Sequence, residues 1–396
     1  MTKKAEIEDL IKEAISLYSE DGTLKNEAII LFNIILYIIA DKIKFPSDTI
    51  NNREKRNLIM DALNHLKNIK NTSYEEFKGY IEEGSRKSGR KKYSIVFSLN
   101  LSKENIEGLT EINLDNKTLE NVNKDDFCKK ISKKFDLDRN LYQYFEKAEW
   151  CKVTLWAPDK ESALNFGYSF SEQIRSLINF VLASHKIYYQ YPPKPLASIT
   201  PSYCYFLFDE GENYISHYYS MWHYDYKQVN ISDKDFKKVI NFIKEVDALG
   251  KSKEHKLKRM FLESLRLYNE ALDSDRYEFS FIVLWSIVDI LIPNIKNNKE
   301  YLKNFFREDK KWEQMIDALY NKRNLLIHQG KIFDVDLDDL NLLKFVIDKL
   351  LKFVFDISKD FQKPEQFEKL ITNLSLDDEQ LQENINILSY IKRKRY

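Results

Sequence analysis

Cysteine is scarce in this sequence, and the few cysteines are placed where they exclude several kinds of site. The 396 residues include three cysteines, Cys128, Cys151 and Cys204, which lie far apart and form no CxxC pair. An odd number of widely spaced cysteines excludes a disulfide framework and a zinc site built on cysteine pairs. Free thiols are typical of a reducing compartment, so we expect a cytoplasmic protein without a bound metal ion.

Net charge, long apolar runs and glycine-rich phosphate loops are also lacking. The 62 basic and 62 acidic residues give a formal net charge of zero, so a nucleic acid would have to bind a local basic patch. The longest apolar run, residues 28–40, is too short to cross a bilayer, so we expect a buried helix there and no contact with a membrane. The chain has no Walker or GxGxxG loop and does not begin like a secretion signal, so we expect no nucleotide cofactor.

The spacing of apolar residues changes along the chain and predicts three parts. In residues 1–83 apolar side chains recur every three or four positions, as in amphipathic helices. Residues 93–249 contain both strand-like and helix-like patterns. After the polar, glycine-led stretch 250–254, the pattern of residues 255–396 is helical again. We therefore expect a mainly α fold, in which an N-terminal helical region and an α+β middle domain precede a C-terminal helical bundle.

The expected middle domain has two clear strands and one long helix. Residues 93–101 and 149–157 alternate as strands do, and residues 162–185 form an amphipathic helix pattern. Residues 214–226 are unusually rich in aromatic side chains. These rings either stack on bases or a ligand, or pack one face of a sheet against the long helix.

A basic stretch, residues 84–92, separates the first two parts and is expected to be a loop, because glycine and serine interrupt it. Its cations are Arg86, Lys87, Arg90, Lys91 and Lys92. They either bind RNA phosphates or keep a linker in solvent.

An acidic cluster in the third part invites comparison with a calcium loop. It consists of Asp334, Asp336, Asp338 and Asp339, but it lacks the Gly at the sixth and the Glu at the twelfth position of such a loop. We expect these carboxylates to complement the N-terminus of a helix instead.

The groups best suited to catalysis lie at the end of one predicted helix, residues 311–328. Gly330 follows and is expected to stop the helix, which places His328 in the last turn. The negative end of the helix dipole favours the imidazolium form of a histidine there. Asn324 lies four residues earlier and shares a face with His328. Arg323 points about 140° away, but its long side chain can reach the same pocket.

This set of side chains suits phosphoryl transfer without a metal ion. Histidine can move a proton near neutral pH, and arginine can bind a phosphate and stabilise charge on it in the transition state. Asn324 can orient either the histidine or the phosphate. The alternative is structural, because Arg, Asn and His at the end of a helix also cap carbonyl groups or face solvent.

Two stretches of the third part resemble the HEPN domain. Residues 323–328 resemble the Arg-x4-6-His signature of that family in its Arg-Asn-x-x-x-His form. Residues 284–289, Leu-Trp-Ser-Ile-Val-Asp, resemble the Leu-Trp-x-x-x-acid helix of the ApeA-like branch, and they precede the first motif by a similar interval. The resemblance covers residues 256–391. HEPN domains are helical bundles, and many are metal-independent ribonucleases that work as dimers.

The resemblance implies roles for four residues. Arg323 and His328 would be the catalytic pair, Asn324 their polar companion, and Asp289 the acidic group of the neighbouring helix. It also implies a homodimer or higher homo-oligomer that cleaves host or phage RNA, possibly tRNA, in prokaryotic antiviral defence by abortive infection, with a phage-derived trigger. The toxin branch carries His-x-Tyr after its motif, which Gln329-Gly330 do not match, so the AMP-modified tyrosine switch of that branch is not expected.

A second hypothesis belongs to a different class of protein. In it the HEPN bundle is a non-catalytic unit for dimerisation or RNA binding, and the middle domain recognises a ligand. Replacement of His328 distinguishes the two hypotheses, because only the ribonuclease depends on that side chain for cleavage.

Overall fold

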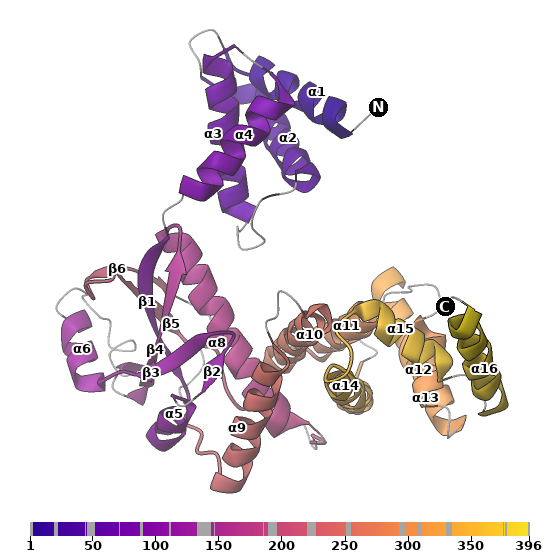
Figure 1. Cartoon of the computed structure of the whole chain (residues 1–396). Coiled ribbons are helices and arrows are strands. Elements are labelled where there is room, and N and C mark those ends of the chain that lie inside the picture. The colour runs from indigo at the N-terminus through magenta and orange to yellow at the C-terminus, as the bar shows by residue number, and fades with distance from the viewer. Residues whose placement is uncertain are drawn as a thin grey trace. The chain divides into compact units, whose positions relative to one another are not determined.

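The structure is mainly α-helical and contains one antiparallel sheet region. The computed structural model describes residues 3–19, 23–43, 45, 52–70, 72–87, 90–110, 112–132, 144–145, 147–184, 186–188, 196–219, 227–250, 255–292, 298–306, 310–329, 335–374, 376 and 378–394. Figure 1 shows the chain in two compact units. One is Met1–Lys91 with Trp156–Ser162, and the other is Lys92–Leu155 with Ala163–Tyr396.

The first unit is helical, as its sequence pattern predicts. Its elements are α1 (Lys3–Ser16), a short 3-10 helix (Asn26–Ala28), α2 (Ile29–Lys42), α3 (Asn52–Asn68) and α4 (Tyr74–Lys87). Buried aliphatic and aromatic residues from all four α-helices form its core, among them Ile11, Phe32, Ile39, Leu63 and Phe77.

Helix α2 is only half buried, which corrects the expectation that the apolar run of residues 28–40 is a buried helix. It packs Phe32, Ile35 and Ile39 into the core, while Ile30 is 75% exposed and Tyr37 is 66% exposed. The reason is geometric, because three other helices can cover only part of the circumference of a helix. Among the described residues, no helix is both long and apolar enough to cross a membrane.

The loop expected at residues 84–92 is also shorter than predicted. Helix α4 continues to Lys87, and strand β1 (Lys91–Leu99) begins only four residues later. Gly84 lies inside α4 because the helix passes close to α3, where a Cβ atom on Gly84 would come within 3.0 Å of Leu58 Cδ2. The glycine therefore serves a close helix contact rather than a turn.

The second unit begins with a sheet whose strands lie in the order β2-β3-β4-β1-β5-β6. The other strands are β2 (Asn113–Leu114), β3 (Lys117–Asn121), β4 (Glu149–Ala157), β5 (Cys204–Phe208) and β6 (Tyr214–Tyr219). The pairs β2–β3, β3–β4, β1–β5 and β5–β6 are antiparallel. Three helices accompany this sheet: α5 (Lys103–Leu109), α6 (Lys124–Ser132) and α8 (Lys160–Ala183).

Alternate residues of β1 point to different cores, which explains the alternation in the sequence. Ile95 faces α8, and the packing is so close that a Cβ atom on Gly167 of α8 would lie 2.8 Å from it. Val96 faces the other way, into an aromatic cluster with Phe127 of α6 and Trp150 of β4. The sheet is therefore covered by α8 on one face and by α6 on the other (Figure 1).

The aromatic stretch of residues 214–226 is only partly described. Its first part is strand β6, where Tyr218 packs 6.4 Å from Tyr205 of β5 and Tyr219 packs 6.0 Å from Tyr203 between ring centroids. These contacts favour the packing interpretation for residues 214–219. Residues 220–226 lie outside the described residues.

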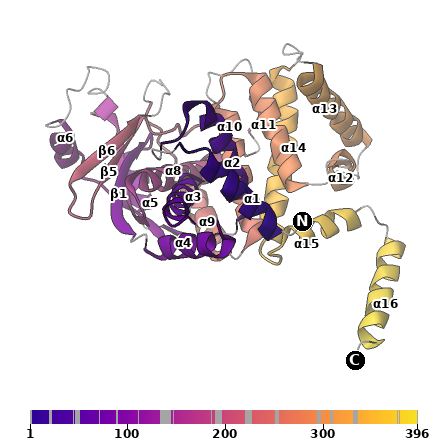
Figure 2. The ribbon, with the colours of Figure 1, turned by 90° about the horizontal axis from the view of Figure 1, so that it is seen from above.

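The remaining helices follow the sheet in the same compact unit. They are α9 (Asp233–Ala248), α10 (Lys256–Asp273), α11 (Tyr277–Leu291), α12 (Asn298–Phe305), α13 (Lys310–Gln329), α14 (Leu337–Ile357), α15 (Pro364–Asn373) and α16 (Asp378–Lys394). Figure 2 shows α10, α11 and α14 packed beside one another. The two compact units are therefore not divided at residues 250–254, and the separate status of residues 93–249 and 255–396 as domains stays a prediction.

Two buried cations fasten α8 to the helices after residue 255. Arg175 donates to Asp273 of α10 at 2.9 and 2.6 Å and also pairs with Glu172 on its own helix. Lys344 of α14 donates to the carbonyl oxygens of Ala183 and Lys186 at the end of α8, at 2.6 and 3.2 Å. A lysine at this end also complements the helix dipole of α8.

The acidic cluster before α14 has the structural role that its sequence predicts. Asp336 accepts a hydrogen bond of 2.9 Å from the backbone N–H of Asp339, and the Asp339 carboxylate accepts one of 3.2 Å from the N–H of Asp336. This is a reciprocal capping box, which satisfies two free donors at the start of the helix. Asp334 lies outside the described residues.

Candidate functional site

Helix α13 carries the predicted catalytic groups in its last two turns. It spans Lys310–Gln329, which confirms the helix expected at residues 311–328. Ile316, Leu319 and Leu326 are buried and fix the orientation of the helix. The description of His328 is limited to its backbone, in the last turn of α13. Gly330, the expected helix stop, lies outside the described residues.

The structure brings the predicted Arg323, Asn324 and Asp289 together. A guanidinium nitrogen of Arg323 lies 3.7 Å from the Asp289 carboxylate of α11, and another donates to the Asn324 side-chain oxygen at 3.2 Å. Asp289 also accepts a hydrogen bond of 2.7 Å from Asn298 at the start of α12. Three helices therefore hold one polar cluster, and Asn298 is the member that the sequence did not reveal.

Asn298 gave no signal in the sequence for a clear reason. It lies in a connector rich in lysine and asparagine, where one asparagine looks like the next. In the structure its side chain is buried, and its hydrogen bond turns the Asp289 carboxylate so that the other oxygen faces Arg323. Only the tertiary contact distinguishes it from its neighbours.

The guanidinium of Arg323 is held but not saturated. Its side chain is 19% exposed, and that of Asp289 is 33% exposed. The Nε atom is buried and has no hydrogen-bond partner among the residues that the structure describes. A guanidinium has five N–H donors, and leaving a buried donor unpaired costs about 1–3 kcal/mol. Arg323 can therefore gain free energy by binding an anion, and phosphate fits its planar fork of donors.

Lysines of α12 surround this cluster and stabilise the helix pair. Lys299 and Lys303 lie 3.0 and 2.8 Å from Asp317 of α13, and the hydrogen bond from Lys303 is the main reason that the pKa of Asp317 is lowered. Lys299 also lies 5.4 Å from the ring centroid of Tyr320. These contacts place positive charge near Arg323 on the side from which an anion would approach.

The predicted cations of the basic stretch do not form one described cluster. Arg86 and Lys87 end α4 in the first unit, and the description of their side chains stops short of those residues' contacts. Arg90 and Lys91 are exposed, and Lys92 is half-buried in β1. Their role in RNA binding stays a prediction.

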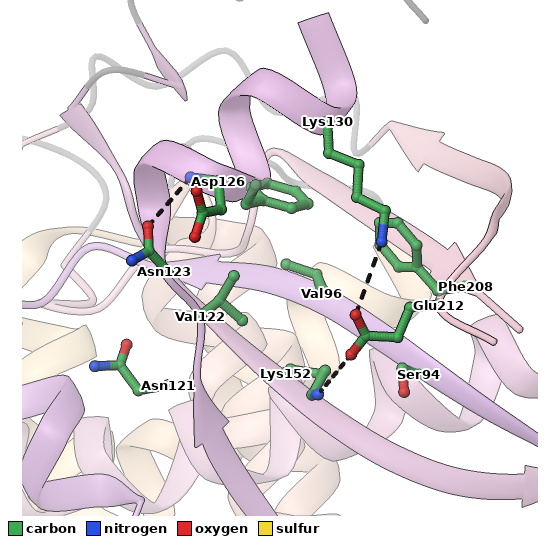
Figure 3. A pocket seen from close by; sticks show the side chains of 11 residues that line it. Ser94, Val96, Asn121, Val122, Asn123, Asp126, Lys130, Lys152, Phe208 and Glu212 are labelled. Carbon is green, nitrogen blue, oxygen red and sulfur yellow. Dashed lines mark hydrogen bonds and ion pairs between the residues drawn. The ribbon is translucent and has the colours of Figure 1, made fainter. Parts of the chain in front are cut away.

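A second candidate site is a pocket in the sheet region, shown in Figure 3. It has a volume of about 340 Å³, which is within the range of small-molecule sites. Its floor is apolar and includes Val96, Phe127 and Phe208. Its rim carries amide, hydroxyl and charged groups from four strands or turns and from α6. An apolar floor with a few converging polar groups is typical of a ligand pocket.

One carboxylate lies between two lysines at the mouth of this pocket. Glu212 lies 3.8 Å from Lys130 of α6 and 3.5 Å from Lys152 of β4 (Figure 3). Its backbone has a φ of 57°, a left-handed conformation that is unusual for glutamate. Burial alone would lower the pKa of Lys152, but the hydrogen bond and charge of Glu120, together with Glu212, raise it overall. The lysine is therefore a cation that anions already surround.

Within the described residues, no group of three or more His, Cys, Asp or Glu side chains is placed to hold a metal ion. Comparison of the chain with protein-family models, curated proteins and solved structures found no match.

Proposed function

We propose that this chain is a metal-independent endoribonuclease of the HEPN type, whose active site forms where two copies of α13 meet. The observation that carries the proposal is the partly satisfied guanidinium of Arg323, which Asp289 and Asn324 hold one helical turn before His328. A purely structural arginine would be expected to use more of its donors inside the protein.

The reaction follows from the groups in the cleft. The 2′-hydroxyl of RNA attacks the neighbouring phosphorus, so that a new O2′–P bond forms and the P–O5′ bond breaks. One His328 accepts the 2′-hydroxyl proton, and the protonated His328 of the second copy donates a proton to O5′. The products are a 2′,3′-cyclic phosphate and a 5′-hydroxyl end.

Arg323 stabilises the negative charge that develops on the phosphorane oxygens. Asp289 and Asn298 act on the guanidinium rather than on the RNA, because their contacts hold it in one orientation. The long Arg323–Asp289 distance of 3.7 Å leaves the guanidinium free to shift toward a phosphate. They are positioning residues, and Arg323 and His328 are the catalytic residues.

The biological setting is proposed from the resemblance alone. It is prokaryotic antiviral defence by abortive infection in the cytoplasm, with tRNA or another host or phage RNA as the substrate. In this setting residues 1–249 hold the enzyme inactive until a phage product is present.

The test is cleavage of total tRNA in EDTA by the wild type, His328→Ala and Arg323→Met. Gln314→Ala, at an exposed position of the same helix, is the matched control. We expect the control to cleave like the wild type, and each site variant to be slower by roughly 100-fold or more. Products with cyclic-phosphate ends identify the mechanism, and equal cleavage by wild type and His328→Ala would refute it. If no protein cleaves, the assay is repeated in extract of phage-infected cells.

A second candidate function is a ligand-sensing protein with a non-catalytic helical bundle. The pocket at Glu212 favours it, because a carboxylate between two lysines occupies the position that an anionic group of a ligand would take. Calorimetry with inorganic phosphate tests this reading. Saturable binding that is lost in Lys152→Met supports it, and heat of dilution alone contradicts it.

A further inference from the structure

Helix α16 has almost no packing partner in its own chain. Among its described side chains only Leu381 and Ser389 are even half-buried, and Ile385 and Leu388 are 54% and 65% exposed. Figure 2 shows α16 standing apart from the helices that pack around α14. An isolated helix of 17 residues is only marginally stable in water, so this one needs a partner.

The apolar residues of α16 form a seam rather than a scatter. Leu381, Ile385 and Leu388 follow one another at spacings of four and three residues. This is the spacing of a helix that pairs with one other helix, because it keeps a narrow apolar stripe on one side. A helix that packs on a broad core would carry a wider stripe.

The charges of α16 are separated along its length. Its anions, Asp378, Glu379 and Glu383, all lie in the first half, and its cations, Lys392, Arg393 and Lys394, all lie in the last turn. This order suits the dipole of a single helix. It also makes the helix complementary to an antiparallel copy of itself, whereas a parallel copy would place like charges together.

We propose that α16 pairs with the α16 of a second copy of this chain in antiparallel orientation. With Ile385 of one copy opposite Leu388 of the other, Glu379 falls near Lys394 at both ends of the pair. The same surface then serves both copies, as a two-fold interface requires. This surface is separate from the cleft proposed for α13, and self-association is measured without RNA, so the inference stands or falls independently of the ribonuclease.

The first test is the mass of the full chain in solution, from light scattering after size-exclusion chromatography at tens of micromolar. We expect the wild type to be a dimer and Leu388→Gln, which breaks the seam, to be a monomer. Asn386→Ala changes an exposed residue on another face of the same helix and should stay dimeric. A monomeric wild type, or a Leu388→Gln variant that remains dimeric, overturns the proposal.

Charge reversal tests the partner and its orientation. A basic variant carries lysine at 378, 379 and 383, and an acidic variant carries glutamate at 392, 393 and 394. Each alone should be monomeric, and the two mixed should form a heterodimer, which also shows that neither is unfolded. Glutamate at Lys234, Lys237 and Lys244 of α9 is the control with equal charge change. High salt should weaken the antiparallel wild-type dimer, and a dimer that salt strengthens contradicts this orientation.

Discussion

Replacement of Asp289 by Asn separates a positioning role from a structural one. The substitution keeps an oxygen that can accept the 2.7 Å hydrogen bond from Asn298, and it removes only the charge beside Arg323. At an effective dielectric constant of about 20, unit charges 3.7 Å apart attract by about 4.5 kcal/mol. Solvent reaches both groups, however, and measured pairs of this kind contribute about 1 kcal/mol or less.

The expected loss is therefore small in stability and visible in activity. If the ion pair holds the guanidinium in its working orientation, kcat/KM for RNA should fall roughly fivefold to tenfold, because 1.4 kcal/mol corresponds to a factor of ten. The free energy of unfolding should fall by about 1 kcal/mol at most. The pair Asp289→Asn and Arg323→Met should be no slower than Arg323→Met alone, because both changes act through one group.

The assay is initial rate of tRNA cleavage in EDTA, with urea unfolding measured on the same proteins. Asp317→Asn is the matched control, because Asp317 pairs with Lys299 and Lys303 rather than with Arg323. Full activity in Asp289→Asn would refute the positioning role. Equal losses in both variants would show that any weakening of α12 and α13 reduces activity, and would refute it as well.

Three further variants test the fold and the pocket. Arg175→Met leaves two buried carboxylates without their cation and should cost about 3–5 kcal/mol in urea unfolding; a loss below about 1 kcal/mol contradicts the buried cluster. Gly167→Ala places a Cβ atom 2.8 Å from a β1 side chain and should cost about 1–3 kcal/mol, whereas Gly79→Ala, with no atom within 4 Å, should be neutral or stabilising. Glu212→Gln should raise the affinity for inorganic phosphate about fivefold in calorimetry, and Lys152→Met should lower it; a change of the same sign in both contradicts competition by Glu212.

Local patterns in the sequence predicted local structure well. The spacing of Trp312, Met315, Ile316 and Leu319 predicts α13, and the aspartates before Leu337 predict a capped helix start. Helical spacing also placed Asn324 on the face of His328. The approach of Asp289 to Arg323 was expected only by resemblance, because it depends on how α11 packs against α13.

The errors have a common cause, which is that burial depends on partners distant in the sequence. Residues 28–40 are apolar nearly all round, yet the first unit covers only one side of α2. Gly84 looked like a loop residue, but it allows α4 to approach Leu58 of α3. Asn298 gained its place from a hydrogen bond to a different helix. No short window of sequence contains these facts.

The two fastenings of α8 determine how the second unit can respond to a ligand. To slide or rotate against α10, α8 would have to strip Arg175 from Asp273 and leave both charges buried and unpaired. It would also lose Lys344 from its end. A soft hinge is therefore unfavourable at this junction, and α8 should move together with α10 and α14 as one stiff lever. A displacement that begins in the sheet would reach the helices around Arg323 with little loss along the way.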